Sequence, residues 1–465
     1  MILTNLKIYS DGLIRKGAIY IKEGIIEKIY YESSEKMVEK IEELKKNNQQ
    51  IDCQNKLAIP GLIDIHSHLR DMGQSEKETF RTGTTAAAFS GITTVLNMPN
   101  TQPPAITSTK VKKWMQKAKN NIFVDVGFIA GVPKEIDEGE IRQIIESGIF
   151  GFKIYPLSSL NQVDWTDPLN IQKILSISQK FQVPIFIHPD WPLPDDQKAE
   201  IHQKFNLTGY SFLKYHNDLF PVHMEAKYVN FVLENYQKII ADNNPKADDY
   251  PIVHFCHISC NNSYSLIKSA LETKPYLKIS FEITPHHLIL SNEIELKNPN
   301  FGKVLPPLRD KEHPSYLFNE LKEGNVNFIA TDHAPHTIEE KQDKLNAPSG
   351  FPGFETYPLL LLDKVSKYEL SLDNFIKAAS ENPAKYFNLK NKGFIKKGFD
   401  ADLVIIDKIS EFPIKSHKFK TKAKFSPFEN YMTSIHIWKV FLRGKEVNVD
   451  NIEPNGKIIH HNYKI

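Results

Sequence analysis

Short apolar stretches that end in polar residues alternate along this chain with longer stretches of helical periodicity. Eight such apolar stretches occur in the middle of the sequence, at residues 61–68, 92–100, 122–131, 148–156, 183–190, 251–259, 277–287 and 326–334. Helix-like segments stand between several of them, as at 75–90, 139–148 and 170–181. This alternation favours parallel β/α units, and eight units predict an α/β fold of the (β/α)8 TIM-barrel type. A doubly wound open sheet is the competing layout.

The two ends of the chain have a different pattern, because both consist of short alternating segments typical of strands. Residues 392–407 and 434–450 are examples near the C-terminus. We therefore expect a small β-sandwich domain built from residues 1–57 plus 392–465, beside a barrel of residues 58–391. A polar and aromatic segment at about 190–250 is longer than the other connections, and we interpret it as a lid or an oligomer contact.

Composition narrows the class of protein. The 58 basic residues nearly balance the 56 acidic ones, so no global field predicts binding to nucleic acid or to an anionic membrane. Three cysteines do not form a disulfide framework. The N-terminus lacks the basic-then-apolar order of a signal peptide, and no apolar run reaches the ~18 residues of a membrane span. We expect a cytoplasmic protein.

The polar residues at the ends of the predicted strands have the chemistry of a metal site. They are His66, His68, Lys153, His188, His257 and Asp332. The C-terminal ends of barrel strands meet on one face, and neutral imidazoles with a carboxylate suit zinc. His66 and His68 lie two apart, so both can bind one ion. Two ions need a bridge, and a neutral Lys153 could add carbon dioxide to become a bridging carbamate.

Two residues near His257 are interpreted differently. Adjacent strand residues face opposite ways, so we expect Cys256 to serve in packing. By the same alternation, His254 is expected to point to the other face of the strand. Neither residue is included in the predicted metal site.

Several motifs together resemble the dihydroorotases of the amidohydrolase superfamily. They are "PGLIDIHSHLRD", "AAAFSGITTVLNMPNTQPP", "GFKIYP", "TPHHL", "KVLPPLR", "ATDHAPHT" and "APSGFPGFET", between about residues 58 and 360. The resemblance implies two Zn2+ ions bridged by carboxylated Lys153 and hydroxide. One ion would be held by His66, His68 and Asp332, and the other by His188 and His257.

The resemblance also implies a reaction and a substrate. The reaction is the reversible cyclisation of N-carbamoyl-L-aspartate to L-dihydroorotate in pyrimidine (UMP) biosynthesis, with Asp332 as general base and then acid. Arg70, Asn100 and His336 match the family's residues that bind the free carboxylate of the substrate. A guanidinium fork fits a carboxylate well. We expect a homo-oligomer, and association with a carbamoyltransferase is left open.

Two other functions remain as alternatives. Allantoinases and dihydropyrimidinase-type cyclic amidohydrolases share the barrel and the metals, but their substrates present no equivalent carboxylate for Arg70. A non-catalytic dihydroorotase-like scaffold is the second alternative, and the intact set of metal-binding residues argues against it. Leu305 and the "HPD" segment at 188–190 depart from the usual family pattern, which leaves the contacts to the substrate ring undefined.

Overall fold

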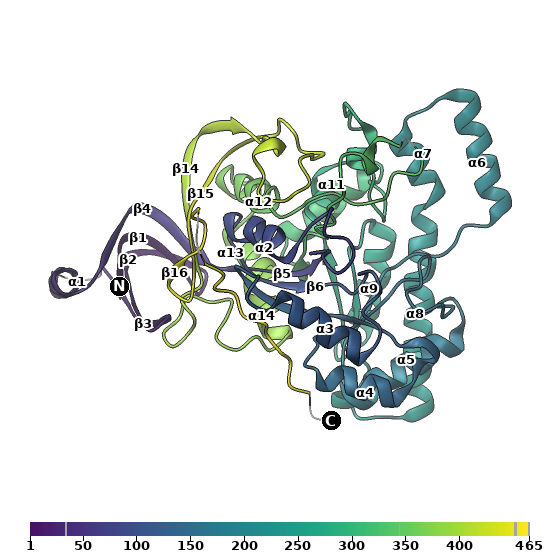
Figure 1. Cartoon of the computed structure of the whole chain (residues 1–465), viewed down its shortest axis with the longest axis horizontal. Helices are drawn as coiled ribbons and strands as arrows, with labels where there is room; N and C mark the ends of the chain where they lie inside the picture. The colour runs from purple at the N-terminus through teal and green to yellow at the C-terminus, as the bar shows by residue number, and fades with distance from the viewer. Residues whose placement is uncertain (33–34, 344, 451–452, 464–465) are drawn as a thin grey trace.

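The computed structural model describes residues 1–32, 35–343, 345–450 and 453–463. The two ends of the chain share one seven-stranded sheet with the order β16-β15-β14-β4-β1-β2-β3. Its strands are β1 (Ile2–Ser10), β2 (Leu13–Lys22), β3 (Ile25–Tyr31), β4 (Gln50–Pro60), β14 (Leu403–Pro413), β15 (Met432–Leu442) and β16 (Lys445–Glu446). Figure 1 shows this sheet at one end of the molecule, with α1 (Glu35–Asn47) beyond it.

Strand β4 joins the N-terminal and C-terminal halves of this sheet. It runs parallel to β1 and antiparallel to β14, where Ile59 lies opposite Val404. Leu3, Ile19 and Phe441 belong to the buried cluster of this sheet. The two chain ends therefore form one β unit, while its limits at residues 57 and 392 remain predictions.

The middle of the chain forms parallel strands that alternate with helices. The strands are β5 (Leu62–Ser67), β6 (Ile92–Asn97), β7 (Asp125–Phe128), β8 (Ala130–Gly131), β9 (Phe152–Ile154), β10 (Ile185–Ile187), β11 (Val253–Phe255), β12 (Ile279–Ile283) and β13 (Phe328–Ile329). They pair in the orders β5-β6-β7 and β13-β12-β11-β10-β9-β8. A parallel bridge joins Ser67 of β5 to His333, in the segment that follows β13. Each of the eight predicted apolar stretches contains a strand.

Most of the helices between these strands have one buried apolar face. In α4, for example, Ile141, Ile144 and Ile145 are buried, and the Asp137 side chain caps the helix by accepting from the Glu140 amide at 2.7 Å. The helices are α2 (Phe80–Phe89), α3 (Ser108–Ala118), α4 (Glu138–Glu146), α5 (Pro168–Phe181), α6 (Asp195–Thr208), α7 (Phe212–Leu219), α8 (Val222–Asn243), α9 (Asn261–Thr273), α10 (Pro285–Ile289), α11 (Glu312–Lys322), α12 (Tyr357–Ser366), α13 (Leu372–Ile376) and α14 (Asn382–Tyr386). The chain therefore consists of an α/β unit and, beside it, the β unit formed by the chain ends.

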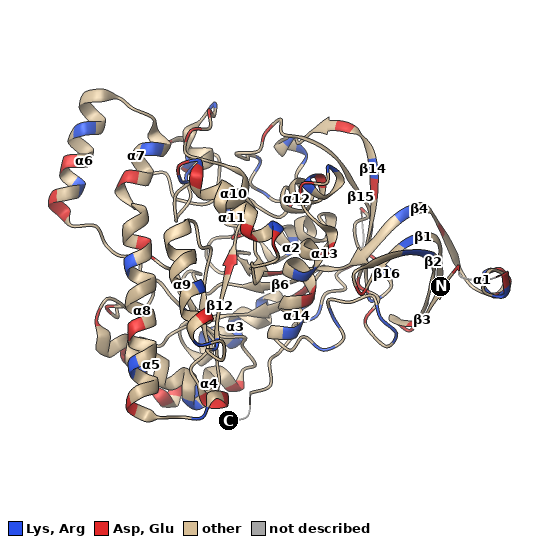
Figure 2. Ribbon diagram, turned by 180° about the vertical axis from the view of Figure 1, so that it is seen from behind, with Lys and Arg blue, Asp and Glu red and all other residues tan. Residues whose placement is uncertain are grey.

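The long segment at 190–250 is helical. Helix α8 packs against α5 and α9 and buries Tyr228, Val232 and Tyr236. Helix α6 has no buried side chain and projects from the body of the molecule (Figure 1). Figure 2 shows charged residues of both signs along α6 and α8. Whether this segment is a lid or an oligomer contact stays a prediction.

The last part of the chain leaves the terminal sheet and follows β7. The Val126 amide donates to the Lys457 carbonyl at 2.9 Å, and the Ile459 amide donates to the Val126 carbonyl at 3.0 Å. This part of the predicted 392–465 domain therefore lies against the α/β unit, because its backbone groups complete hydrogen bonds with that strand. Within the residues that the structure describes, no helix combines the length and the hydrophobicity needed to cross a membrane.

Candidate metal centre

His66, His68 and Asp332 converge where β5 and β13 end. The Nε2 atoms of His66 and His68 lie 3.4 and 3.0 Å from the same Oδ1 atom of Asp332. Asp332 has a φ of 47°, in the left-handed region that a non-glycine residue seldom adopts. Such backbone strain is common where a side chain must be aimed at a site. The three residues together have the donor types of one metal-binding group.

His188, His257 and Lys153 lie next to this group. His188 follows β10, His257 follows β11, and Lys153 belongs to β9. The His257 ring centroid is 4.5 Å from that of His188 and 5.2 Å from that of His66. Lys153 is buried and lies close enough to His66, His188 and His257 for its positive charge to disfavour their protonation. The fold thus brings together all six residues that the sequence predicts as metal ligands.

The hydrogen bonds of this cluster fit a metal centre. Buried Lys153 Nζ, His188 Nε2 and His257 Nδ1 have no hydrogen-bond partner among the described residues. Buried polar atoms in folded proteins are usually paired, so three unpaired nitrogens in one place require another partner. Imidazole nitrogens beside a carboxylate are the donor set that divalent zinc accepts. The residues present therefore fit the metal that the sequence predicts.

The charges favour the ligand forms of four of these residues, namely His68, His188, His257 and Asp332. Burial holds the pKa of His188 and of His257 well below the ordinary value, and it lowers the pKa of His68 to about 4 although Asp332 opposes this. Burial alone would raise the pKa of Asp332, but the His66 and His68 rings hold it below its usual range. Metals bind neutral imidazole and ionised carboxylate, which are the forms favoured here.

Glu282 on β12 lies directly behind His66, and sequence reasoning missed it. Its fully buried carboxylate contacts His66 Nδ1 and accepts from His254 Nε2 at 3.0 Å and from the His257 amide at 3.2 Å. Burial alone would lower the pKa of His66, yet Glu282 raises it to about 10. The expectation that His254 points away from the site is wrong, because its ring reaches the carboxylate that holds His66.

Asp64 is a second buried carboxylate that sequence reasoning missed. It accepts from the His66 amide and from the Thr331 amide, both at 3.1 Å, and also from the Thr331 hydroxyl. Burial raises its pKa to about 7. Asp64 thereby ties the end of β5 to the end of β13, which carry His66 and Asp332. A charged residue inside an otherwise apolar strand was the available signal for both Asp64 and Glu282.

The residues predicted to bind the substrate carboxylate lie beside the centre. Arg70 Nη2 is 3.1 Å from His336 Nε2, and Arg70 Nε donates to the Pro335 carbonyl at 3.2 Å. Asn100 Oδ1 is 2.6 Å from His68 Nδ1, so Asn100 also orients a predicted metal ligand. Arg70 is buried and has no carboxylate within ion-pair distance among the described residues. A buried guanidinium without a counter-ion is suited to bind an anion.

Tyr155 and His333 complete the surroundings of the centre. The Tyr155 hydroxyl is buried without a hydrogen-bond partner among the described residues, and its ring centroid is 5.9 Å from that of His188. Sequence reasoning did not select Tyr155. His333 stacks on Phe354 with ring centroids 3.8 Å apart and accepts from the Gly353 amide at 3.1 Å. His333 therefore supports the loop next to Asp332.

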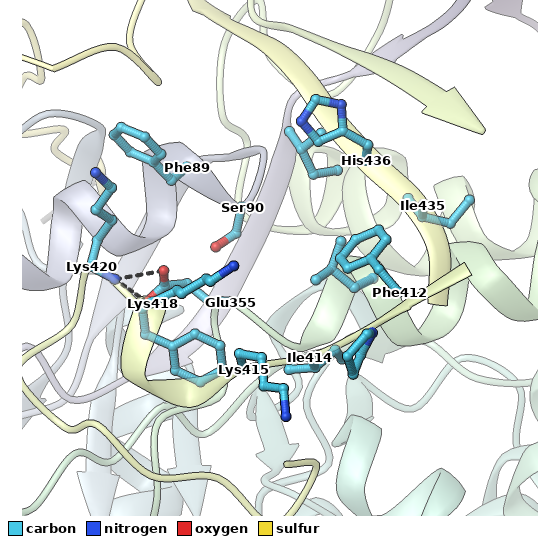
Figure 3. Close-up of a pocket in the computed structure, with 14 residues that line it drawn as sticks. Phe89, Ser90, Glu355, Phe412, Ile414, Lys415, Lys418, Lys420, Ile435 and His436 are labelled. Atoms are coloured by element: carbon cyan, nitrogen blue, oxygen red, sulfur yellow. Dashed lines mark hydrogen bonds between the residues drawn. The ribbon is translucent and has the colours of Figure 1, made fainter. Parts of the chain in front are cut away.

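A separate cavity of about 300 Å³ lies between α2, α12 and the strands β14 and β15 (Figure 3). Its lining is mainly apolar, with Lys415 and Lys418 at its edge. Glu355 in this cavity accepts from the Lys420 amide at 2.7 Å and from the Thr421 amide at 3.1 Å. Because this carboxylate is bound to backbone and only one imidazole lines the cavity, the cavity does not have the chemistry of a metal centre.

The sequence matches the profile of the amidohydrolase family at residues 57–165 and 303–456. A dihydroorotase from Methanosphaera stadtmanae is 34% identical over 439 residues, which are 92% of each chain. A dihydroorotase from Pyrococcus abyssi is 32% identical over 454 residues, covering 97% of this chain and 95% of the relative. The similarity therefore extends over almost the whole length of both relatives.

Solved structures of hydantoinases have the same fold. The L-hydantoinase (dihydropyrimidinase) from Arthrobacter aurescens has a TM-score of 0.84 at 23% identity, covering 99% of both chains. The D-hydantoinase (dihydropyrimidinase) from Thermus sp. has a TM-score of 0.82 at 24% identity. At this level of identity the likeness concerns the fold alone. The family profile and the curated relatives together show that this chain belongs to the amidohydrolase family, among the dihydroorotases.

Proposed function

We propose that this enzyme catalyses the reversible cyclisation of N-carbamoyl-L-aspartate to L-dihydroorotate. The observation that carries the proposal is the buried Arg70 beside His336, which has no counter-ion among the described residues and lies next to a cluster of histidines and Asp332. The cluster suits hydrolysis of a cyclic amide, and Arg70 suits a substrate with a free carboxylate. The dihydroorotases from Methanosphaera stadtmanae and Pyrococcus abyssi support the same reaction.

The centre is proposed to hold two zinc ions. One would be held by His66, His68 and Asp332, the other by His188 and His257, with carboxylated Lys153 between them. The unpartnered nitrogens of Lys153, His188 and His257 support this assignment. When bound, the ions would polarise the amide carbonyl of the substrate and lower the pKa of the attacking water.

Asp332 is proposed to move the proton during the reaction. Its pKa is held below the usual range by the neighbouring imidazoles, so the carboxylate is available as a base at neutral pH. In the hydrolytic direction Asp332 would take a proton from water and deliver it to the leaving ring nitrogen. Cyclisation would use the same groups in reverse order.

Arg70, His336 and Asn100 are proposed to hold the substrate by its free carboxylate. Burial and the positive charge of Arg70 keep the pKa of His336 below its ordinary value. The neutral ring of His336 can therefore accept from Arg70 Nη2 through Nε2, which holds the guanidinium in place without adding a second buried charge. Asn100 Oδ1 already contacts His68, so its amide nitrogen is the group left for the substrate.

The parallel strands are proposed to close into a (β/α)8 TIM barrel. The bridge between Ser67 and His333 supports closure between β5 and β13. Only Ile129 separates β7 from β8, so the two parallel sheets can be continuous there.

The domain limits proposed from the sequence are kept, although residues 456–461 lie along β7. A cytoplasmic location, a homo-oligomer and association with a carbamoyltransferase stay predictions.

The proposal is tested by comparing three substrates. The purified, zinc-loaded protein would be assayed with L-dihydroorotate, allantoin and dihydrouracil under identical conditions. We expect the highest kcat/KM for dihydroorotate, because only this substrate offers a carboxylate to Arg70. A preference for allantoin or dihydrouracil would overturn the proposal in favour of the other cyclic amidohydrolases. No turnover of any of the three would favour the scaffold alternative.

A further inference from the structure

We infer that Glu282 is a positioning residue that sets the orientation and tautomer of His66 for metal binding. The inference rests on the proposed metal centre, but not on the identity of the substrate. Glu282 belongs to β12, whereas His66 is on β5, 216 residues earlier in the chain. The contact between them therefore depends on the tertiary fold and is not a local turn.

The Glu282 carboxylate determines which nitrogen of His66 can bind a metal. Nδ1 of His66 faces Glu282 Oε1, and a carboxylate can only accept, so Nδ1 must carry the hydrogen. In the neutral ring, Nε2 then has the free lone pair. That Nε2 atom is the one that lies 3.4 Å from Asp332 Oδ1, on the side of the proposed ion. Partners of this kind orient a ligand and increase its basicity.

Two further contacts hold Glu282 itself in place, and a third holds its partner His254. The second oxygen, Oε2, accepts from His254 Nε2 at 3.0 Å, and His254 Nδ1 is 3.0 Å from the Ser280 hydroxyl. The His257 amide donates to Oε1 at 3.2 Å. Glu282, His254 and Ser280 are all buried. One carboxylate thereby fixes the ring of His66 and the backbone of His257, two proposed ligands of different ions.

The contacts also separate Glu282 from the groups that touch substrate. Both carboxylate oxygens are already occupied by the two rings and one amide, and none of these contacts involves Arg70, Asn100 or His336. Glu282 therefore acts through His66. Loss of its charge should weaken metal binding before it changes the recognition of substrate.

The test is the zinc affinity of Glu282→Gln, measured by competition with a chromophoric chelator in the absence of substrate. We expect affinity to fall about 10- to 100-fold, the usual effect of losing such a partner. Glu225→Gln is the matched control, since Glu225 is also a buried glutamate but pairs with Arg309 at 2.8 Å and with the Ser259 amide at 3.1 Å. Affinity within about threefold of the parent protein in folded Glu282→Gln would overturn the inference.

A second measurement separates positioning from general destabilisation. The visible spectrum of the cobalt-loaded protein reports ligand geometry, so it should change in Glu282→Gln and stay as in the parent in Glu225→Gln. An unchanged spectrum in Glu282→Gln would count against the inference. If Glu282→Gln does not fold, the zinc affinity of Glu282→Asp is measured in its place. The shorter aspartate side chain cannot reach both rings, so this variant should also bind zinc more weakly. Parent-like affinity in Glu282→Asp would overturn the inference.

These experiments do not depend on the reaction. If the protein binds zinc but does not turn over dihydroorotate, the proposed function fails while the result on Glu282 stands. If dihydroorotate is turned over and the Glu282 variants keep parent affinity, the function stands and the positioning role fails.

Discussion

Two buried polar clusters in this molecule use similar residues in different ways. The metal centre lies where the parallel strands end, whereas the second cluster lies at the start of β7 and surrounds Lys392. Lys392 Nζ is 2.8 Å from Asp125, 3.1 Å from Asp400 and 2.7 Å from Asp402. Arg443 adds a contact to Asp125 at 2.6 Å. We call these five residues the Lys392 cluster.

The difference between the clusters is whether their polar atoms are paired. In the Lys392 cluster every charged group has an opposite charge within 3.1 Å, and the cluster joins β7 to the sheet of the chain ends. In the metal centre, Lys153, His188 and His257 each keep an unpartnered buried nitrogen among the described residues. Paired buried charges are explained by the fold alone, whereas unpaired ones need a ligand to explain them. This contrast, and not the size of a cavity, separates the metal centre from the Lys392 cluster.

The largest expected effect is that of Lys153→Ala. If Lys153 bridges two ions, its removal should lower turnover by at least about a thousandfold, beyond the 10- to 100-fold effect of outer partners. Zinc content should fall as well, as measured by atomic absorption. Because Lys153 makes no hydrogen bond among the described residues, the thermal stability of the metal-free protein should be retained or increased.

Chemical rescue sharpens this first prediction. Short carboxylic acids such as formate or acetate can replace the carbamate oxygens, so they should restore part of the activity of Lys153→Ala. The same acids should not change the parent enzyme. Full activity of Lys153→Ala without added acid would remove the bridge from the proposed centre.

The Lys392 cluster should respond in the opposite way. Lys392→Met leaves three carboxylates with one cation, and breaking a buried ion pair typically costs about 3–5 kcal/mol. We expect this loss in the free energy of unfolding, measured by urea denaturation. Zinc content and kcat of the folded fraction should remain at the parent value. A loss of zinc with unchanged stability would reverse the roles that we assign to the two clusters.

Arg70 tests whether a buried charge without a counter-ion serves ligand binding. It is buried and charged, and its proposed partner is the carboxylate of the substrate. Arg70→Met should lower kcat/KM for dihydroorotate about 10- to 100-fold, because a hydrogen bond to a charged group contributes about 1.5–3 kcal/mol. Steady-state kinetics would measure this, with zinc content as the control. Loss of zinc in this variant would mean that Arg70 supports the centre structurally.

Much of the fold could be predicted from the sequence, because periodicity reports burial. Every apolar stretch contains a strand, and the β character of both chain ends was also visible. All six predicted ligands meet, since strand ends converge in parallel β/α units. The path of residues 456–461 along β7 could not be predicted, because those residues carry no apolar alternation of their own.

The partners of the ligands could not be predicted for a different reason. Glu282 and Asp64 sit inside strands, and each has a decisive contact more than 200 residues away in the sequence, Glu282 with His66 and Asp64 with Thr331. Strand alternation also fails at the site itself. The pairing of β5 with β6 shifts register between Asp64 and Ser67, and His257 has a φ of 34°. A regular-strand rule counted from His257, which follows the end of β11, therefore misplaced His254, which lies inside that strand.

The smallest expected effect concerns pH and the carboxylates left in Lys392→Met. Burial already raises the pKa of Asp402 above its ordinary value, although Lys392 opposes this. Without Lys392 the pKa of Asp402 should rise further, whereas Arg443 still holds Asp125 ionised. A carboxyl group whose pKa is higher in the folded than in the unfolded state destabilises the fold at pH above that pKa. Protonation relieves this cost as the pH falls.

The stability deficit of Lys392→Met relative to the parent should therefore be larger at pH 8 than at pH 5, by about 1–2 kcal/mol for a pKa rise of about one unit. Urea denaturation of both proteins at the two pH values measures the difference, and Lys392→Met with Asp402→Asn is the control in which it should disappear. A deficit that is equal at both pH values would show that Asp402 stays ionised without Lys392. In that case Arg443 and backbone donors would supply the stability of the Lys392 cluster. Fewer paired charges would then distinguish this cluster from the metal centre.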